Sequence, residues 1–251
     1  MFKKINIANI LMDNVTMLET LDAIEGFVVR GTPCYVTNPN VDIVIRYNRD
    51  AEFADYYKGG ALCVADGMPI LWAAKFLGTP LKEKISGSDL VPRVCELANI
   101  KGYKLFFLGG RPGAAQAAEE KLRKTLLHLK VVGAYAPPLG FEKDGTELKK
   151  IAAMVKEAKP DILFVGLGAP KQERWIKQYH QELGVPVSMG VGVTFEFIAG
   201  IVKRAPKWMQ KTGLEWFWRL CMEPGRLWKR YLIDDMQFFG LILKQRIKGN
   251  K

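Results

Sequence analysis

The sequence has few cysteines, and none of them are paired in the chain. Its 251 residues include four cysteines, Cys34, Cys63, Cys95 and Cys221, which lie far apart and form no Cys-x-x-Cys pair. This spacing argues against a zinc site and against a disulfide framework. It is typical of a protein from a reducing compartment.

Long hydrophobic runs are also missing. The longest apolar run late in the chain, residues 238–243, is far shorter than the roughly 18 to 20 residues that a membrane-spanning helix needs. The first residues do not resemble a signal peptide, because Asn6, Asn9 and Asp13 interrupt the apolar positions. We therefore expect a cytoplasmic protein.

Several motifs of nucleotide and metal chemistry are absent as well. The chain has neither a Walker A motif nor a Gly-x-Gly-x-x-Gly fingerprint followed by an acidic residue, which argues against a dinucleotide oxidoreductase. It has no Asp-x-Asp, and the adjacent Asp234 and Asp235 point in different directions on a predicted helix. His128 and His180 lie on polar helical segments and are expected to be solvated. The sequence therefore predicts no metal and no cofactor.

The charge is concentrated in the last fifth of the chain. The formal net charge is +11, and residues 200–251 alone contribute +8 together with four of the six tryptophans. The preceding residues are nearly neutral. We therefore expect two parts, a core over residues 1–199 and a basic, tryptophan-rich helical appendage over residues 200–251.

Short apolar runs alternate with helical patterns along the core, which predicts βαβ units and a parallel sheet. The predicted strands are 34–37, 62–65, 104–108, 131–135, 161–165 and 186–189. The predicted helices are 41–47, 69–76, 89–98, 114–127, 146–158 and 172–180. The expected fold class is α/β, a Rossmann-like, mainly parallel sheet flanked by helices, with the basic helical appendage at the C-terminus.

Three predicted strands end in glycine-rich turns. The residues of interest are Gly109, Gly110 and Arg111, then Gly166, Gly168, Pro170, Lys171 and Glu173, and finally Gly190 and Gly192. Glycine lets the backbone approach a ligand closely, and the helix N-terminus that follows Pro170 favours an anion. Ligands of open α/β sheets bind beyond the carboxyl ends of the strands. An ordinary strand-to-helix turn is the alternative, but the density of glycine, proline and polar residues favours a nucleotide or phosphate site.

Two further strand ends carry polar side chains. Asp66 follows an apolar strand and is a candidate general base, because an aspartate is ionised at neutral pH and can accept a proton. Its alternative role is to cap the next helix. Thr37, Asn38 and Asn40 offer hydroxyl and amide groups to a sugar, although Asn40 could equally be only a helix cap.

The residue pattern of the appendage predicts an amphipathic helix and a second helix over residues 226–246. Leu214, Phe217, Trp218 and Cys221 recur with helical spacing, and Arg226 and Arg230 share a face of the second helix. A basic, aromatic segment also suits single-stranded nucleic acid. That alternative leaves the glycine turns and Asp66 unexplained. Stabilisation by UDP rather than by an oligonucleotide would distinguish the two.

Seven motifs together resemble the TagA/WecG group of bacterial glycosyltransferases. They are Thr37-Asn-Pro-Asn, Ala65-Asp-Gly-Met, Ser86-Gly-Ser-Asp-Leu, Phe107-Leu-Gly-Gly-Arg-Pro-Gly, Val165-Gly-Leu-Gly-Ala-Pro-Lys-Gln-Glu, Gly190-Val-Gly and Lys203-Arg-Ala-Pro-Lys-Trp-Met-Gln. The resemblance runs in order from about residue 5 to residue 244. One position departs from the family, because Lys84 stands where the family usually has arginine. A lysine keeps the charge but loses the two-pronged geometry.

The resemblance implies transfer of N-acetylmannosamine from UDP-N-acetylmannosamine to GlcNAc-diphospho-undecaprenol in wall teichoic acid linkage-unit synthesis. It implies that Asp66 is the base and that Thr37 and Gln172 line the same pocket. N-acetylmannosaminuronic acid, used by the enterobacterial branch, and glucose stay open as donor sugars.

On this basis we expect an inverting, metal-independent glycosyltransferase. Helix N-termini and cations must then neutralise the diphosphate. The available groups are Gly110, Arg111, Lys171, Arg219, Arg226 and Arg230. Tyr135 is a candidate to stack on uracil, with a core aromatic as its alternative.

The lipid-linked acceptor implies peripheral binding to the inner face of an anionic membrane. The basic appendage would supply that attraction. No nucleic-acid partner is expected, and the sequence leaves a homo-oligomer open.

Overall fold

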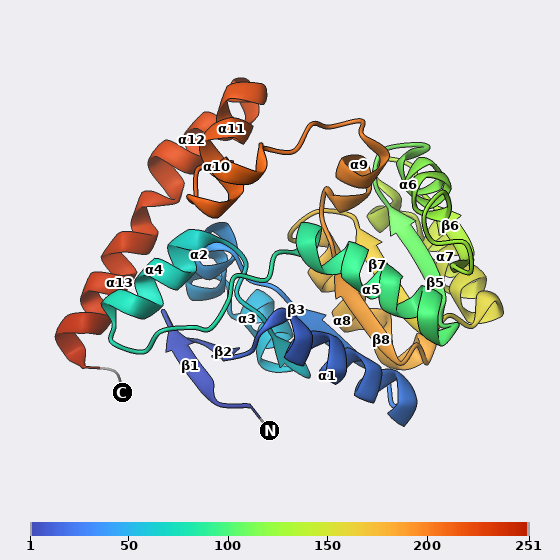
Figure 1. Cartoon of the computed structure of the whole chain (residues 1–251), viewed down its shortest axis with the longest axis horizontal. Helices are drawn as coiled ribbons and strands as arrows, with labels where there is room; N and C mark the ends of the chain where they lie inside the picture. Colours follow the sequence, from blue (N-terminus) through green and yellow to red (C-terminus); the bar gives the residue numbers. More distant parts are fainter. Residues whose placement is uncertain (1, 250–251) are drawn as a thin grey trace.

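The protein is described by a computed structural model covering residues 2–249. Its centre is a six-stranded sheet with the order β4-β3-β8-β7-β5-β6, in which all paired strands are parallel. The strands are β3 (Cys34–Thr37), β4 (Leu62–Cys63), β5 (Lys104–Gly109), β6 (Lys130–Tyr135), β7 (Ile162–Gly166) and β8 (Val187–Gly190). The predicted parallel sheet is therefore confirmed (Figure 1).

Helices cover both faces of this sheet. Along β5, Leu105 and Phe107 belong to one buried cluster, whereas Phe106 and Leu108 belong to the other, because alternate side chains point to opposite faces. The first cluster also includes residues of α1 (Met17–Arg30), α5 (Gly87–Lys101), α6 (Ala114–Arg123) and α9 (Thr194–Ala199). The second includes residues of α2 (Val41–Arg49), α3 (Ala51–Lys58), α7 (Gly145–Ala158) and α8 (Lys171–Leu183). A short 3₁₀ helix, Phe141–Lys143, precedes α7.

A β-hairpin near the N-terminus was not predicted from the sequence. Strands β1 (Lys4–Ile7) and β2 (Ile10–Asp13) pair antiparallel, and Ala8 and Asn9 form the turn with φ of 47° and 72°. Asparagine tolerates this left-handed conformation, which two-residue hairpin turns require. Asn9, which looks like a polar interruption in the sequence, is therefore part of the turn that makes the hairpin.

Helices α1 and α3 were also missed, although α1 carries a recognisable start. The Thr16 side chain accepts a hydrogen bond from the Glu19 N–H, and the Glu19 carboxylate accepts one from the Thr16 N–H. This reciprocal pair is a capping box, and it satisfies two backbone donors at the helix start. The Thr-x-x-Glu spacing was therefore a usable signal.

The appendage contains more helices than the sequence indicated. After α9 come α10 (Lys207–Lys211), α11 (Glu215–Met222), α12 (Pro224–Lys229), a π turn (Arg230–Asp234) and α13 (Met236–Lys248). The single second helix predicted for residues 226–246 is therefore interrupted. A π turn adds one residue, which rotates the following helix by about 100°. After it, Phe238 and Ile242 face the interior.

The appendage lies against the hairpin and α4 (Met68–Phe76), on one side of the molecule (Figure 1). Phe238 and Ile242 of α13 are buried in one cluster with Ile5, Met12 and Ile70. The Gln245 side chain donates to the Asn6 carbonyl at 2.9 Å and accepts from the Ala8 N–H at 2.8 Å. The basic segment is therefore packed onto the core along much of its length.

The structure also bears on membrane-spanning helices and on the cysteines. No helix within residues 2–249 combines the length and apolar character needed to cross a bilayer. Cys34, Cys63, Cys95 and Cys221 are all free thiols.

Candidate active site

Two of the predicted glycine turns meet at the carboxyl ends of β5 and β7. The Gly110 N–H donates to the Gly166 carbonyl at 2.8 Å, and a Cβ atom on Gly109 would lie only 2.6 Å from that carbonyl. Glycine is therefore required for this approach. The following helices, α6 and α8, pack on opposite faces of the sheet. Adjacent strands whose helices leave to opposite faces form a switch point, where open α/β sheets bind ligands.

The third glycine turn, after β8, adjoins the second. A Cβ atom on Gly166 would lie 3.0 Å from the Gly192 carbonyl oxygen. The buried Gln172 joins the turn to α8, because its Oε1 accepts from the Gly192 N–H at 3.1 Å. A Cβ on Gly190 would approach the same amide to 2.7 Å. In this structure Gln172 therefore shapes the turn, and its predicted catalytic role stays a prediction.

The neighbours of Gln172 on α8 differ in their surroundings. Glu173 is buried and accepts hydrogen bonds from the Gln172 amide at 2.9 Å and from the Tyr57 hydroxyl at 3.3 Å. Burial raises the pKa of its carboxyl. Lys171 is exposed and forms an ion pair with Glu142 at 2.6 Å. The peptide bond between Ala169 and Pro170, just after Gly168, is cis. Lys171 is thus accessible to a ligand, whereas Glu173 belongs to a buried network.

The polar residues after β3 have separate contacts. The Thr37 hydroxyl is buried and donates to the Leu62 carbonyl at 3.3 Å. Asn40 caps α2 by accepting from the Ile43 N–H at 3.2 Å, which is the capping alternative left open by the sequence. Asn38 reaches the start of α5, where a Cβ on Gly87 would lie 3.0 Å from its amide nitrogen. The same Cβ would lie 3.8 Å from the Thr194 hydroxyl oxygen, so the ends of β3 and β8 meet α5 here.

Asp66 lies beside this meeting point. Its N–H donates to the Pro39 carbonyl at 3.1 Å, and the Ile85 N–H donates to the Ala65 carbonyl at 2.8 Å, which brings the loop carrying Lys84 alongside. The residue that caps α4 is Gly67, with φ of 109°. The capping alternative for Asp66 is therefore not the one that the structure contains.

The surroundings of Asp66 bring the pKa of its carboxyl close to neutral pH. Desolvation raises the pKa of its carboxyl to about 7. Lys84 and Arg204 oppose this rise in pKa, whereas Glu215 and Asp89 add to it. A group with a pKa near the working pH is well suited to proton transfer.

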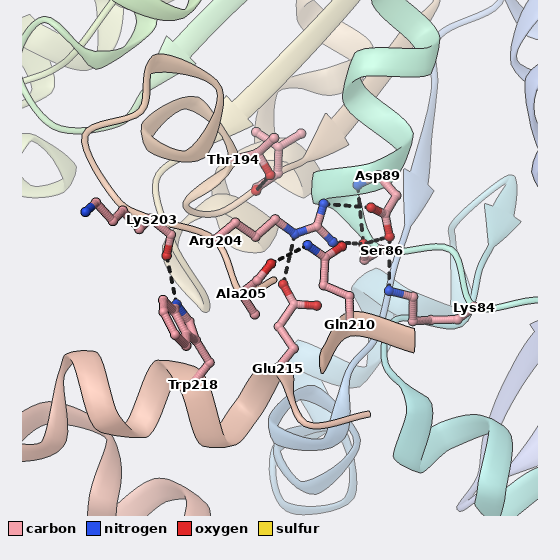
Figure 2. Close-up of polar contacts among 11 residues, drawn as sticks. Lys84, Ser86, Asp89, Thr194, Lys203, Arg204, Ala205, Gln210, Glu215 and Trp218 are labelled. Atoms are coloured by element: carbon pink, nitrogen blue, oxygen red, sulfur yellow. Dashed lines mark hydrogen bonds and ion pairs between the residues drawn. The ribbon is translucent and has the colours of Figure 1, made fainter. Parts of the chain in front are cut away.

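The four charged side chains that shift the pKa of Asp66 form a bridged cluster, which consists of Lys84, Asp89, Arg204 and Glu215 (Figure 2). Lys84 lies 3.0 Å from Asp89, which is in the first turn of α5. Arg204 lies 2.6 Å from Asp89 and 2.9 Å from Glu215 on α11. Lys84, which replaces the family arginine, therefore forms an ion pair with Asp89, whereas Arg204 contacts two carboxylates, those of Asp89 and Glu215.

Tyr135 lies at the other edge of the sheet. It ends β6, whereas Asp66 follows β4 at the opposite edge. Its hydroxyl is bonded to Glu147 and accepts from Lys150 at 2.8 Å. The structure therefore does not bring Tyr135 together with Asp66. Arg111 is exposed beside the switch point, and its N–H donates to the buried Glu196 at 3.0 Å.

The three predicted arginines of the appendage have different partners. Arg219 is half-buried on α11, the helix that carries Glu215. Arg226 is exposed and pairs with Glu223. Arg230 lies 3.9 Å from Asp42 of α2 and 4.0 Å from Asp235. Only Arg219 therefore shares an element with the cluster around Asp66.

A metal site was not predicted. Within the part of the chain that the structure describes, no three His, Cys, Asp or Glu side chains are arranged to hold a metal ion. Metal-independent chemistry stays a prediction that needs its own test.

The sequence analysis missed three residues of the cluster, Asp89, Arg204 and Glu215. Asp89 and Arg204 lie in Ser86-Gly-Ser-Asp and Lys203-Arg-Ala-Pro, two of the motifs that carry the family resemblance, which was the available signal. Glu215 lies outside those motifs. Only the fold shows that it faces Arg204.

Comparison with known proteins supports the family resemblance that the sequence motifs indicate. The model of the family described as "Glycosyl transferase WecG/TagA/CpsF family" matches residues 5–251. Two similar proteins are both named N-acetylglucosaminyldiphosphoundecaprenol N-acetyl-beta-D-mannosaminyltransferase. The one from Bacillus subtilis (strain 168) is 29% identical over 90% of this chain and 86% of its own length. The one from Staphylococcus aureus (strain MW2) is 31% identical over 99% of this chain and 96% of its own length.

Proposed function

This chain belongs to the WecG/TagA/CpsF family of glycosyltransferases, and we propose that it transfers N-acetylmannosamine from UDP-N-acetylmannosamine to GlcNAc-diphospho-undecaprenol. The observation that carries the proposal is Asp66, a desolvated carboxylate with a pKa of about 7 that follows β4 and donates its backbone N–H to Pro39, just after β3. The glycine turns continue from there to the switch point. The acceptor and donor sites would therefore lie side by side at the carboxyl ends of the parallel strands.

Asp66 would act as the general base. It takes the proton from the acceptor hydroxyl as that oxygen forms a bond to the anomeric carbon of the donor. The bond from this carbon to the diphosphate breaks at the same time, and UDP leaves from the opposite side. Attack opposite the leaving group inverts the anomeric centre and requires one base rather than a nucleophile on the protein.

The leaving diphosphate needs positive charge without relying on a metal. The N-termini of α6 and α8 begin beside the glycine turns at the switch point, and helix N-termini attract phosphate. Arg111 and Lys171 are exposed at the same turns. Arg219, Arg226 and Arg230 would complete the neutralisation when acceptor and donor are both bound.

The appendage would also hold the enzyme at the anionic surface that contains its acceptor, which places it on the cytoplasmic side of the membrane. Large apolar side chains are exposed on it and on the neighbouring α4. Trp72, Phe76, Trp208, Trp228 and Phe239 are each about half exposed, at 48% to 60%. Basic residues near anionic lipid contribute about 1 kcal/mol each. Aromatic side chains at an interface would add to this attraction.

The test is transfer by the purified full-length chain to a GlcNAc-diphospholipid with a panel of donors. We expect product from UDP-N-acetylmannosamine, with release of UDP, and little from UDP-glucose or UDP-N-acetylmannosaminuronic acid. Preference for one of those two would replace the proposed donor. Absence of transfer from all of them, or stabilisation by oligonucleotide rather than UDP, would contradict the proposed reaction.

Membrane binding is tested separately with vesicles. Co-sedimentation with vesicles containing phosphatidylglycerol should exceed that with neutral vesicles and should fall as salt is added. Equal recovery with both vesicle types would argue against an electrostatic attraction to the membrane.

A further inference from the structure

Arg204 joins the core to the appendage next to the proposed base. Its guanidinium donates to Asp89 of α5 at 2.6 Å and to Glu215 of α11 at 2.9 Å, and it lies 3.5 Å from the Ser86 hydroxyl. We propose that Arg204 is a positioning residue, which seats α11 over the core and sets the balance of charge around Asp66. This inference rests on the proposed function only in taking Asp66 as the base.

The contacts of Arg204 suit an arginine and no other residue. A guanidinium is planar and always charged, and its separate N–H groups can serve two carboxylates in different directions. One carboxylate comes from α5, whereas the other lies on α11, far along the chain. A lysine in the same place could keep the charge but would not hold both carboxylates in a fixed geometry.

The Asp89 side of the bridge is rigidly held. Asp89 also accepts a hydrogen bond from the Ser86 hydroxyl at 2.6 Å and pairs with Lys84. Burial alone would raise the pKa of Asp89, but the hydrogen bonds from Arg204 and Ser86 hold it at about 2. Asp89 is therefore ionised throughout the physiological range and is a permanent anchor for Arg204.

The Glu215 side of the bridge positions a helix that has little else to hold it. α11, which the structure describes over its whole length, contains no fully buried residue. Its remaining polar attachment is the Trp218 indole, which donates to the Lys203 carbonyl at 3.1 Å (Figure 2). Since Lys203 and Arg204 are adjacent, both attachments hold α11 to the same short segment. Loss of Arg204 should therefore release α11 from α5.

The same bridge determines the charge that Asp66 experiences. Desolvation raises the pKa of Asp66, Lys84 and Arg204 lower it, and Glu215 and Asp89 raise it further. These groups come from the loop before α5, from α5 itself, from the segment after α9 and from α11. With α11 in place, removing the charge of Arg204 would raise the pKa of Asp66, whereas removing the charge of Glu215 would lower it.

This opposition of sign separates positioning from a merely structural tether. If Arg204 and Glu215 only held the appendage in place, Arg204→Gln and Glu215→Gln would have the same consequences. If they also balance charge at Asp66, both substitutions loosen α11, but the pKa of Asp66 is higher in Arg204→Gln than in Glu215→Gln. Arg204→Lys is the conservative variant, which should restore the titration but only part of the docking.

The experiment measures both properties in the full-length protein without substrate. Hydrogen exchange over residues 207–222 reports docking, and the carboxyl resonance lost in Asp66→Asn reports the titration of Asp66. We expect faster exchange in Arg204→Gln and in Glu215→Gln, with a higher midpoint of Asp66 in the first than in the second. Arg246→Gln is the control, because it removes a contact of the distant α13 with Leu77 and should leave the midpoint in place.

Catalysis provides the second readout. Arg204→Gln should lower kcat at neutral pH about ten- to hundredfold, the usual effect of losing charge-assisted hydrogen bonds. Arg204→Lys should recover part of that loss. Equal Asp66 midpoints in Arg204→Gln and Glu215→Gln, or a higher midpoint in Glu215→Gln, would overturn the inference. An inactive wild type would refute the proposed function but would leave the exchange and titration measurements interpretable.

Discussion

The two ends of the appendage are attached to the core by different kinds of interaction. At the far end, α13 buries Phe238 and Ile242 against the N-terminal hairpin and α4, and Gln245 pairs with the hairpin backbone. At the near end, α11 contains no fully buried residue over its described length, and Arg204 bridges it to α5. The attachment of α13 therefore depends on apolar burial, whereas that of α11 depends on charge.

This difference corresponds to a difference in role. Apolar burial is non-directional and contributes mainly to stability. An arginine between two carboxylates fixes geometry, and its contribution changes with any charge nearby. The charged attachment supplies charges that shift the pKa of Asp66, whereas the apolar attachment, whose cluster also includes Ala65, supplies none. We therefore expect substitutions at the far end to affect folding and those at the near end to affect catalysis.

The largest effect is expected at the site that the near end covers. Asp66→Asn removes the base but keeps the size of the side chain. It should lower kcat about 10² to 10⁴-fold, the usual contribution of a general base, while UDP affinity changes little. Steady-state kinetics and calorimetric titration with UDP measure the two quantities.

The matched control for this variant is Asp22→Asn, which removes an exposed carboxylate of α1. It should turn over normally. Near-normal turnover of Asp66→Asn would remove Asp66 from the mechanism and would leave the charged cluster without a catalytic purpose.

The far end offers an unusually close pair for comparison. Phe238 is 1% exposed and its neighbour Phe239 is 57% exposed. Phe238→Ala should lower the free energy of unfolding by about 3 to 5 kcal/mol, as is usual for a buried phenylalanine, and Phe239→Ala should change it little. Urea denaturation measures both. Equal losses of stability would mean that burial of Phe238 does not hold the far end.

Substitution of the three arginines of the appendage tests which of them contact the leaving diphosphate. Arg219→Ala, Arg226→Ala and Arg230→Ala are compared on a water-soluble acceptor, where membrane binding does not matter. An arginine that contacts the leaving diphosphate should cost about 1.5 to 3 kcal/mol when removed, or roughly ten- to a hundredfold in rate. Because Arg219 shares α11 with Glu215, we expect its loss to be the largest. Normal turnover of all three would assign them to the membrane surface alone.

The smallest effect is expected from chelation. If cations and helix N-termini neutralise the diphosphate, EDTA should leave the rate unchanged. Loss of activity with EDTA and its recovery with Mg²⁺ or Mn²⁺ would mean that a metal takes the place assigned to the arginines.

Much of the core could be predicted because its signals are local. The glycine turns and Asp66 each follow an apolar strand directly, so their place at the carboxyl edge of a parallel sheet follows from the sequence. The hairpin at Ala8 and Asn9 was missed because Asn9 was interpreted as a polar interruption rather than as part of a turn. The strand order could not be predicted, since it depends on pairings between distant segments.

The cluster around Asp66 was only partly predictable for the same reason. Lys84 was noticed because it departs from the family pattern. Arg204 meets Asp89 across 115 positions of sequence, and Glu215 has no motif of its own. The sequence does not show that these charged residues are partners, because they meet only when the appendage packs against α5.

The most direct test of the account is the dependence of kcat/KM on pH, because a general base must be ionised to act. With the pKa of Asp66 at about 7, activity should fall as the pH drops through 7 and should level off above it. Asp235, whose pKa is raised by desolvation to about 6, is the control, and Asp235→Asn should leave this limb in place. An acidic limb near 7 that persists in Asp235→Asn supports a desolvated Asp66 as the base. A limb near 4, where an ordinary aspartate titrates, would contradict it.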